Sequence, residues 1–243
     1  MRSLGRNRAC VAVLLLLLLA PGRHAAHAWA ADAAPMPMPT PVSFSASDGG
    51  TVYGDLYGAG PRGLVLVHGG RYDKASWAGQ APAFVAAGFR VLAIDLRGYG
   101  ASTGGPDSRD PAGGRHLDVL AAVRFLRDRD ASHVAVLGAS MGGDAAARAA
   151  EAEPAAIDRL VLLAAGAYTP LTAMPGRKLF IVARDDIIGD DTPRLPAIRA
   201  QYDRAAEPKR FVVLDGSAHA QQLFATAQGK RALAEILRFL TAD

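Results

Sequence analysis

The stretch Val134-Ala-Val-Leu-Gly138-Ala-Ser140-Met-Gly142-Gly143 decides the fold of this chain. It opens with an apolar run typical of a buried strand, and an alanine-rich stretch from about Gly143 to Ala152 then favours a helix. Between them stands the pattern Gly-x-Ser-x-Gly. A strand, a sharp turn and a helix hold such a serine above the edge of a sheet, in a turn called a nucleophile elbow. The glycines are needed because a β-carbon there would collide with neighbouring backbone. The stretch therefore predicts that Ser140 is a nucleophile.

The same pattern occurs once more, as Gly100-Ala-Ser102-Thr-Gly104. This copy follows a glycine-rich loop and runs into Gly105-Pro106, so no helix can follow it directly. A flexible loop over the sheet is the expected structure there. Ser102 therefore lacks the context that Ser140 has.

The first 30 residues have the pattern of a secretory signal peptide. A basic start precedes an apolar, leucine-rich run over residues 9–20, and small residues suited to cleavage follow near Ala28 and Ala30. The run is short for a membrane span, which needs about 20 residues. We expect export, to the periplasm or outside the cell, with no stable membrane insertion after cleavage. An uncleaved N-terminal anchor is the alternative.

Removing residues 1–30 changes the charge of the chain. These residues hold four arginines and no acid, which leaves 23 basic and 23 acidic residues in the rest. The net positive charge of the full chain therefore comes from the leader. The rest of the chain has no excess of basic residues that would indicate nucleic-acid binding. Cys10, the sole cysteine, also lies in the leader. Disulfides and a thiol nucleophile are thereby excluded from the mature protein.

Residues 31–41 form a proline-rich linker, and residues 42–243 form one domain. Strands are expected at 42–45, 52–57, 64–67, 90–94, 134–137, 160–163, 179–182 and 211–214. Helices are expected near 77–88, 115–129, 143–152 and 193–205, and around Leu233, Ile236, Leu237 and Leu240. Uninterrupted apolar strands between amphipathic helices predict a mostly parallel sheet of about eight strands, covered on both faces.

A serine hydroxyl needs a base to take its proton, and the base needs a carboxylate to fix its tautomer. His219 follows the expected strand 211–214, so its loop shares the rim of the parallel sheet with Ser140. A purely structural His219 is the alternative. The other histidines after the leader are expected to brace a loop or to lie at surface or capping positions: His68, His116 and His133.

The carboxylate should come from a strand end between Ser140 and His219. The loop after 160–163 contains no acid, whereas the loop after 179–182 reads Ala183-Arg-Asp185-Asp186-Ile187. The residues themselves leave Asp185 and Asp186 as alternatives.

Taken together, these motifs resemble the α/β-hydrolase family over essentially all of residues 42–240. The matching pieces, in order, are His68-Gly69-Gly70, the loop Asp95-x-Arg97-Gly98-x-Gly100-x-Ser102, the turn at Ser140, the aspartate loop and the His219 loop. The resemblance implies a triad of Ser140, an aspartate and His219. The family places the acid just before a small apolar pair, here Ile187-Ile188, which favours Asp186. The glycine usual in that loop is Ala183 here, so Asp185 stays an alternative.

The resemblance also implies an oxyanion hole, in which two fixed backbone N–H groups stabilise the negative charge of the reaction. Met141, the residue after the serine, should supply one donor. Gly70 should supply the other, with Arg71 as second choice. No cofactor and no metal are implied.

The function expected from this machinery is hydrolysis of a small carboxylic ester through an acyl-serine intermediate. The same residues could cleave amides, peptides, lactones or thioesters. A non-catalytic binding protein that retains the fold is the alternative of a different class. Residues 167–177 contain two prolines and are too few for a helical cap, so we expect an open, capless site.

Overall fold

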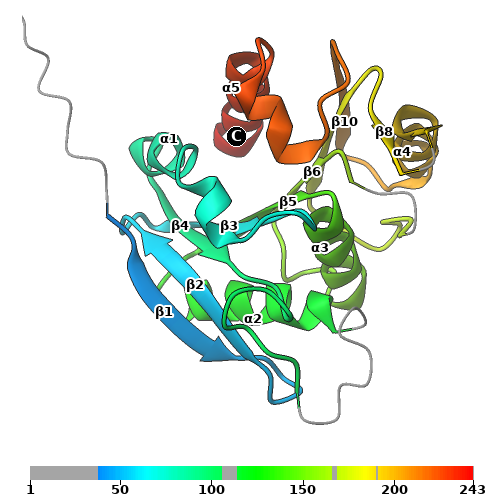
Figure 1. Cartoon of the computed structure of the whole chain (residues 1–243). Coiled ribbons are helices and arrows are strands. Elements are labelled where there is room, and N and C mark those ends of the chain that lie inside the picture. Colours follow the sequence, from blue (N-terminus) through cyan, green and yellow to red (C-terminus); the bar gives the residue numbers. More distant parts are fainter. Residues whose placement is uncertain (1–37, 106–113, 166–168, 190, 243) are drawn as a thin grey trace, which may run out of the picture. The chain divides into compact units, whose positions relative to one another are not determined.

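The computed structural model describes residues 38–105, 114–165, 169–189 and 191–242. The described residues all belong to one compact unit, which lies within Met36–Asp243. The expected leader, residues 1–30, lies outside them. Figure 1 shows a central twisted sheet between two groups of helices.

Among the described residues, eight strands form one sheet in the order β1-β2-β4-β3-β5-β6-β7-β10. The pairs β1–β2 and β2–β4 are antiparallel, and every other neighbouring pair is parallel. The expected mostly parallel sheet is thus confirmed. Its strands are β1 (Thr40–Ser45), β2 (Thr51–Tyr57), β3 (Arg62–Val67), β4 (Phe89–Ile94), β5 (His133–Ala139), β6 (Arg159–Leu163), β7 (Arg177–Ala183) and β10 (Lys209–Leu214).

The helices are α1 (Ala81–Ala86), α2 (Arg115–Arg127), α3 (Met141–Ala152), α4 (Arg194–Arg204) and α5 (Gly229–Thr241), with the short 3₁₀ turns η1 (Lys74–Trp77) and η2 (Ala220–Ala225). In the described part of the chain, none of them has the length and hydrophobicity needed to cross a bilayer.

Alternation along the central strand β3 assigns these helices to opposite faces of the sheet. Val65 and Val67 lie in one buried cluster with residues of α2, α3 and α4. Leu64 and Leu66 lie in the other, with residues of η1, α1 and α5. Successive side chains of a strand point to opposite faces, so a strand buried on both sides is apolar throughout. Figure 1 shows α1 and α5 on one side and α2 and α3 on the other.

This arrangement opens a crevice at the carboxyl ends of β3 and β5. The two strands are neighbours, but the chain leaves β3 toward the face covered by η1 and α1, and it leaves β5 toward the face covered by α3. Loops that part in this way leave room for a ligand at the edge of an α/β sheet.

Residues 77–88 do not form the single helix that was expected. η1 ends at Trp77 and α1 begins at Ala81. Pro82, in the first turn of α1, has no N–H to donate to a preceding turn, which explains the break. Trp77 and Phe84 are both buried all the same. The apolar spacing therefore identified the buried side chains but not the interruption.

Two other elements differ from expectation. α3 begins at Met141, directly after the serine, instead of near Gly143. The loop after β7 contains a small antiparallel hairpin, β8 (Ile187–Ile188) with β9 (Thr192–Pro193), which was not expected. Between β6 and β7 the described residues 169–176 contain no helix, as expected for a capless site.

Arg97 lies at the centre of a buried ionic network in the loop after β4. Its guanidinium donates to Asp118 on α2 at 2.7 Å and to Asp48, in the turn between β1 and β2, at 2.6 Å. Arg97 and Asp118 are buried, at 1% and 0% exposure. Burial raises the pKa of Asp118, whereas the hydrogen bond from Arg97 lowers the pKa of Asp48 to about 2. The network ties the edge of the sheet and α2 to its centre.

We predict that Arg97→Met lowers the free energy of unfolding by about 3–5 kcal/mol, because Asp118 would remain buried without its partner. Urea denaturation measures the change. The matched control is Arg124→Met, which breaks the exposed pair between Arg124 and Glu153 and should cost less than about 1 kcal/mol. Equal losses of unfolding free energy in the two variants would show that the buried network stabilises the fold no more than the exposed pair does.

Candidate active site

Ser140 occupies the sharp turn between β5 and α3. Its backbone has φ 48° and ψ −119°, a conformation that residues other than glycine rarely adopt. Strain of this kind costs about 1–3 kcal/mol and persists only where the surroundings enforce it. Here the N–H of Ser140 donates to Leu163 at 2.9 Å, and its C=O accepts from Gly143 and Asp144. Ser140 thus has the geometry expected of the elbow.

The two glycines of the motif are required by close backbone approach. A β-carbon on Gly142 would lie 2.5 Å from the carbonyl oxygen of His68 and 2.6 Å from that of Val67. A β-carbon on Gly138 would lie 2.5 Å from the carbonyl oxygen of Gly142. These distances are far inside van der Waals contact, so α3 can start this close to β3 and β5 only with glycine at both positions.

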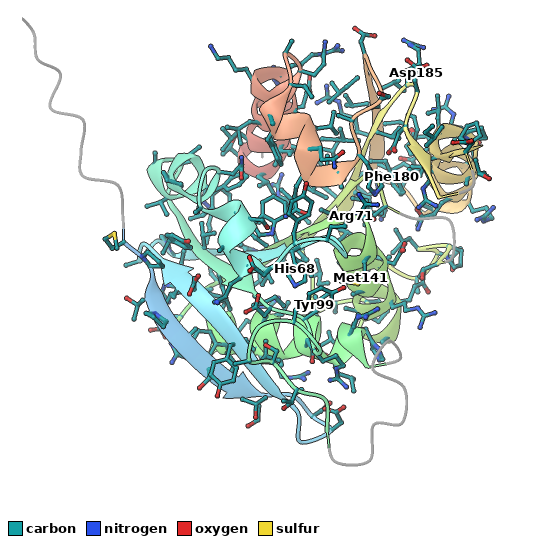
Figure 2. The ribbon with its side chains drawn as sticks, viewed as in Figure 1. His68, Arg71, Tyr99, Met141, Phe180 and Asp185 are labelled. Atoms are coloured by element: carbon teal, nitrogen blue, oxygen red, sulfur yellow. The ribbon has the colours of Figure 1, made fainter. Side chains whose placement is uncertain are left out.

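The structure brings Ser140, His219 and Asp186 together from three different loops. His219 Nε2 lies 2.8 Å from Ser140 Oγ, and its Nδ1 lies 2.9 Å from an Asp186 carboxylate oxygen. Asp186 is fully buried, and the side chain of His219 is 22% exposed. Asp185, the alternative acid, is exposed, and Figure 2 shows it near the tip of the loop after β7.

The second serine and the other histidines have different surroundings. Ser102 is buried, and its Oγ accepts the backbone N–H of Tyr53 at 2.9 Å. It therefore fixes its loop to β2, where a flexible loop had been expected. His133 is exposed and lies 3.3 Å from Asp158. His116 lies half-buried in the first turn of α2.

His68 is fully buried and braces the loop after β3, as expected. Its Nε2 accepts the N–H of Leu96 at 3.2 Å, so its Nδ1 carries the proton and donates to the Gly69 carbonyl at 2.9 Å. Burial lowers the pKa of His68, which favours this neutral form. The carbonyl of Gly69 also accepts the N–H of Tyr72 at 3.0 Å. Two donors thus fix the direction of this carbonyl.

The expected oxyanion donors, Gly70 and Met141, are neighbours in space. A β-carbon on Gly70 would touch the Met141 side chain at 3.8 Å. Within the described residues, neither backbone N–H donates to a protein acceptor, so both are free for a ligand. Tyr99 donates its hydroxyl to the Gly70 carbonyl at 2.9 Å and lies 3.5 Å from Met141 Sδ. Figure 2 shows His68, Tyr99 and Met141 grouped at this point.

Two residues of this site were not identified from the sequence, namely Tyr99 and Gln221. Gln221 is buried, accepts the N–H of Gly69 at 2.8 Å and donates to Ser76 Oγ at 2.6 Å. Gln221 stands two positions after His219, in the stretch Ala218-His219-Ala-Gln221. A polar residue so close to a candidate base was the signal that could have singled it out.

A pocket of about 320 Å³ opens over Ser140 and His219. Its lining includes Gly70 and Arg71, which follow β3, Ile187, which follows β7, and Ala220, which follows β10. Ile187 is an exposed apolar side chain, at 47%. In the described part of the chain, no group of three or more His, Cys, Asp or Glu side chains is placed to hold a metal ion.

A sequence model of the family described as alpha/beta hydrolase fold matches residues 63–186, about half of the chain. The matched segment runs from β3 to Asp186 and includes Ser140. The chain therefore belongs to the α/β-hydrolase family, as its motifs indicated.

The individual relatives match only part of the chain. A 2-hydroxy-6-oxononadienedioate/2-hydroxy-6-oxononatrienedioate hydrolase of Cupriavidus pinatubonensis is 37% identical over 123 residues, which cover 49% of this chain and 41% of that protein. The chain thus spans about two fifths of the length of this curated relative. An uncharacterized protein of Mycobacterium tuberculosis is 30% identical over 210 residues, covering 76% of this chain and 71% of that protein.

Solved structures share the fold. The esterase Pf2001 of Pyrococcus furiosus superposes with a TM-score of 0.70 at 17% identity, covering 84% of this chain and 92% of that one. At this level of identity the likeness shows the architecture alone.

Proposed function

We propose that this protein is a serine hydrolase that cleaves small carboxylic esters through an acyl-serine intermediate. The observation that carries the proposal is the continuous chain of hydrogen bonds from Ser140 through His219 to the buried Asp186. A carboxylate on Nδ1 keeps the proton there and leaves Nε2 free to accept the proton of the serine. This series of hydrogen bonds also favours an enzyme over a binding protein that merely retains the fold.

The reaction follows from these positions. Ser140 Oγ attacks the carbonyl carbon of the ester while its proton passes to His219 Nε2. The carbonyl oxygen becomes negatively charged and accepts hydrogen bonds from the N–H groups of Gly70 and Met141. When the intermediate collapses, the C–O bond to the alcohol breaks, and His219 returns its proton to the departing oxygen. A water molecule, deprotonated by His219, then attacks the acyl carbon, the bond to Ser140 Oγ breaks, His219 returns the proton to Ser140, and the acid is released.

We also propose that the protein is exported. The support is the basic and apolar pattern of residues 1–30 with its small residues at Ala28 and Ala30, which lies outside the described residues. Mass spectrometry of the N-terminus of the protein recovered from the periplasm or medium tests this proposal. A terminus near residue 29 or 31 supports cleavage, and an intact residue 1 contradicts it.

A panel of nitrophenyl esters and aminoacyl nitroanilides tests the substrate class. We expect the esters to be hydrolysed faster. Preference for the anilides would assign the same triad to an amidase or peptidase.

Ser140→Ala should abolish labelling by a fluorophosphonate probe and lower kcat by four to six orders of magnitude, about the loss seen when a triad nucleophile is removed. Ser102→Ala is the matched control, because it removes the same hydroxyl from the other copy of the motif. It should keep full labelling and lose about 1 kcal/mol of stability with its hydrogen bond to Tyr53. Labelling retained in Ser140→Ala, or lost in folded Ser102→Ala, contradicts the assignment.

Asp186→Asn should lower kcat by about 10⁴-fold, because an amide cannot hold His219 in the tautomer that accepts the serine proton. Asp185→Asn changes the adjacent, exposed carboxylate in the same way and should leave kcat within about twofold. Steady-state kinetics on one nitrophenyl ester compare the two. The reverse ranking would identify Asp185 as the acid of the triad and contradict the assignment made from the hydrogen bond between Asp186 and His219.

A further inference from the structure

Arg71 is a cation at the mouth of the candidate active site. It follows Gly70 directly and lines the same pocket as Ser140 and His219. Figure 2 shows it between η2 and the N-terminal end of α3. Arg71 is exposed, and in the described part of the chain its guanidinium makes no hydrogen bond or ion pair with protein.

Asp73, two residues along the chain from Arg71, and Asp186, beside His219, are both engaged elsewhere. Asp73 caps η1, where it accepts the N–H of Ala75 at 2.9 Å. Asp186 is buried behind His219 and bonded to it. The described residues that line the pocket include no carboxylate. A free guanidinium has five donors in a planar fork that matches a carboxylate, so a substrate carboxylate can bind there without competition.

We propose that Arg71 binds a carboxylate of the substrate, so that this hydrolase prefers small esters with an anionic group in the acyl or alcohol part. The inference rests on the proposed ester hydrolysis and specifies its substrate class. The make-up of the pocket supports it, because the cationic Arg71 and the exposed apolar side chain of Ile187 both line it. Such a pocket suits a short apolar segment that ends in a carboxylate.

Two pairs of esters test the proposal, each differing only in a carboxylate. The first pair is 4-nitrophenyl hydrogen succinate and its methyl ester, with the charge in the acyl part. The second is 4-acetoxybenzoate and its methyl ester, with the charge in the alcohol part. For at least one pair, Arg71→Gln should lower the ratio of kcat/KM for the charged over the neutral ester about tenfold, and Arg71→Glu should lower it further. High salt should weaken the preference of the wild type.

Arg184→Gln is the control, because Arg184 is another exposed arginine on a loop at the same rim, paired with Asp215 at 3.7 Å. It should leave both ratios unchanged. If Arg71→Gln changes neither ratio, or lowers the rates on charged and neutral esters equally, the proposal is wrong. If the wild type hydrolyses neither neutral ester and reacts with no fluorophosphonate, the proposed esterase function fails instead.

A separate observation concerns Gln221, which links the loop of His219 to the loop of Gly70. Its side-chain oxygen accepts the Gly69 N–H, and its side-chain nitrogen donates to Ser76 on η1. Gly69 therefore has its N–H held by Gln221 and its C=O held by His68 and Tyr72. Because a peptide unit is planar and trans, fixing the Gly69 carbonyl also fixes the direction of the Gly70 N–H, on the opposite side.

We infer that Gln221 is a positioning residue for the oxyanion hole. Without its acceptor, the buried N–H of Gly69 would lose its partner, and the loop would turn toward water or another acceptor. The Gly70 N–H would then leave the position that the proposed reaction requires, and the transition state would lose more than the bound ester.

Gln221→Met removes both hydrogen bonds with little change of volume. We expect kcat to fall by about one to two orders of magnitude with KM within twofold. Affinity for a boronic acid, which mimics the tetrahedral intermediate, should fall in parallel. Gln201→Met is the control, because Gln201 is also buried and hydrogen-bonded, to Thr169 at 2.6 Å, but on α4. It should lower Tm and leave kcat unchanged.

Ser76→Ala provides a second variant should Gln221→Met fail to fold. Ser76 is half-buried, and its hydroxyl accepts the hydrogen bond from the side-chain nitrogen of Gln221. Removing this hydroxyl should lower kcat about threefold with unchanged KM. A folded Gln221→Met with normal kcat, or a Ser76→Ala that changes only KM, overturns the inference. Loss of the proposed function itself would appear as an inactive wild type.

Discussion

The site depends on the contact between Gly142 and the end of β3. The helix α3 begins so close to the carbonyl groups of Val67 and His68 that no side chain fits between them. This contact fixes the height of Ser140 above the sheet and places Met141 beside Gly70. One close approach of backbone therefore sets both the candidate nucleophile and the two free N–H groups. The strain at Ser140 is held in place by the packing around it, because β5 and β6 bury large apolar side chains worth roughly 1.5–3 kcal/mol each and α3 packs against them through glycine and alanine.

The remaining parts of the site are assembled by the sheet. Because β3, β5, β7 and β10 are parallel, their following loops meet at one rim, although the residues lie far apart in sequence. The rim is fixed mainly by buried polar groups whose hydrogen bonds are satisfied. His68 stays neutral between Leu96 and Gly69, Asp186 is held against His219, and Ser102 is bonded to Tyr53. The described residues that line the pocket include no carboxylate.

The sequence predicted most of this arrangement, because most of it follows from local pattern. The strands followed from apolar runs, the elbow from its glycines, and the positions of Ser140 and His219 from strand ends. Three features could not be read in that way. The break before α1 depends on the missing N–H of Pro82, the β8–β9 hairpin is too short to show a period, and Gln221 acts on Gly69 across 152 positions. The choice of Asp186 rather than Asp185 rested on the resemblance to the family alone. The sequence cannot distinguish two adjacent carboxylates, whereas the structure buries Asp186 and exposes Asp185.

The loop Asp95–Ser102 shows why likeness to a family can carry structure without chemistry. Its charged residues match the family pattern, and the structure shows them holding the fold. Arg97 joins α2 to the β1–β2 turn, and Asp95 accepts the N–H of Lys74 at 2.7 Å, fixing the start of η1. Through η1, the loop supports Ser76 and hence Gln221. Tyr99, from the same loop, bonds to the Gly70 carbonyl. The Gly69–Gly70 backbone, which would bind the oxyanion, is therefore held from two sides, by Gln221 at the Gly69 N–H and by Tyr99 at the Gly70 carbonyl.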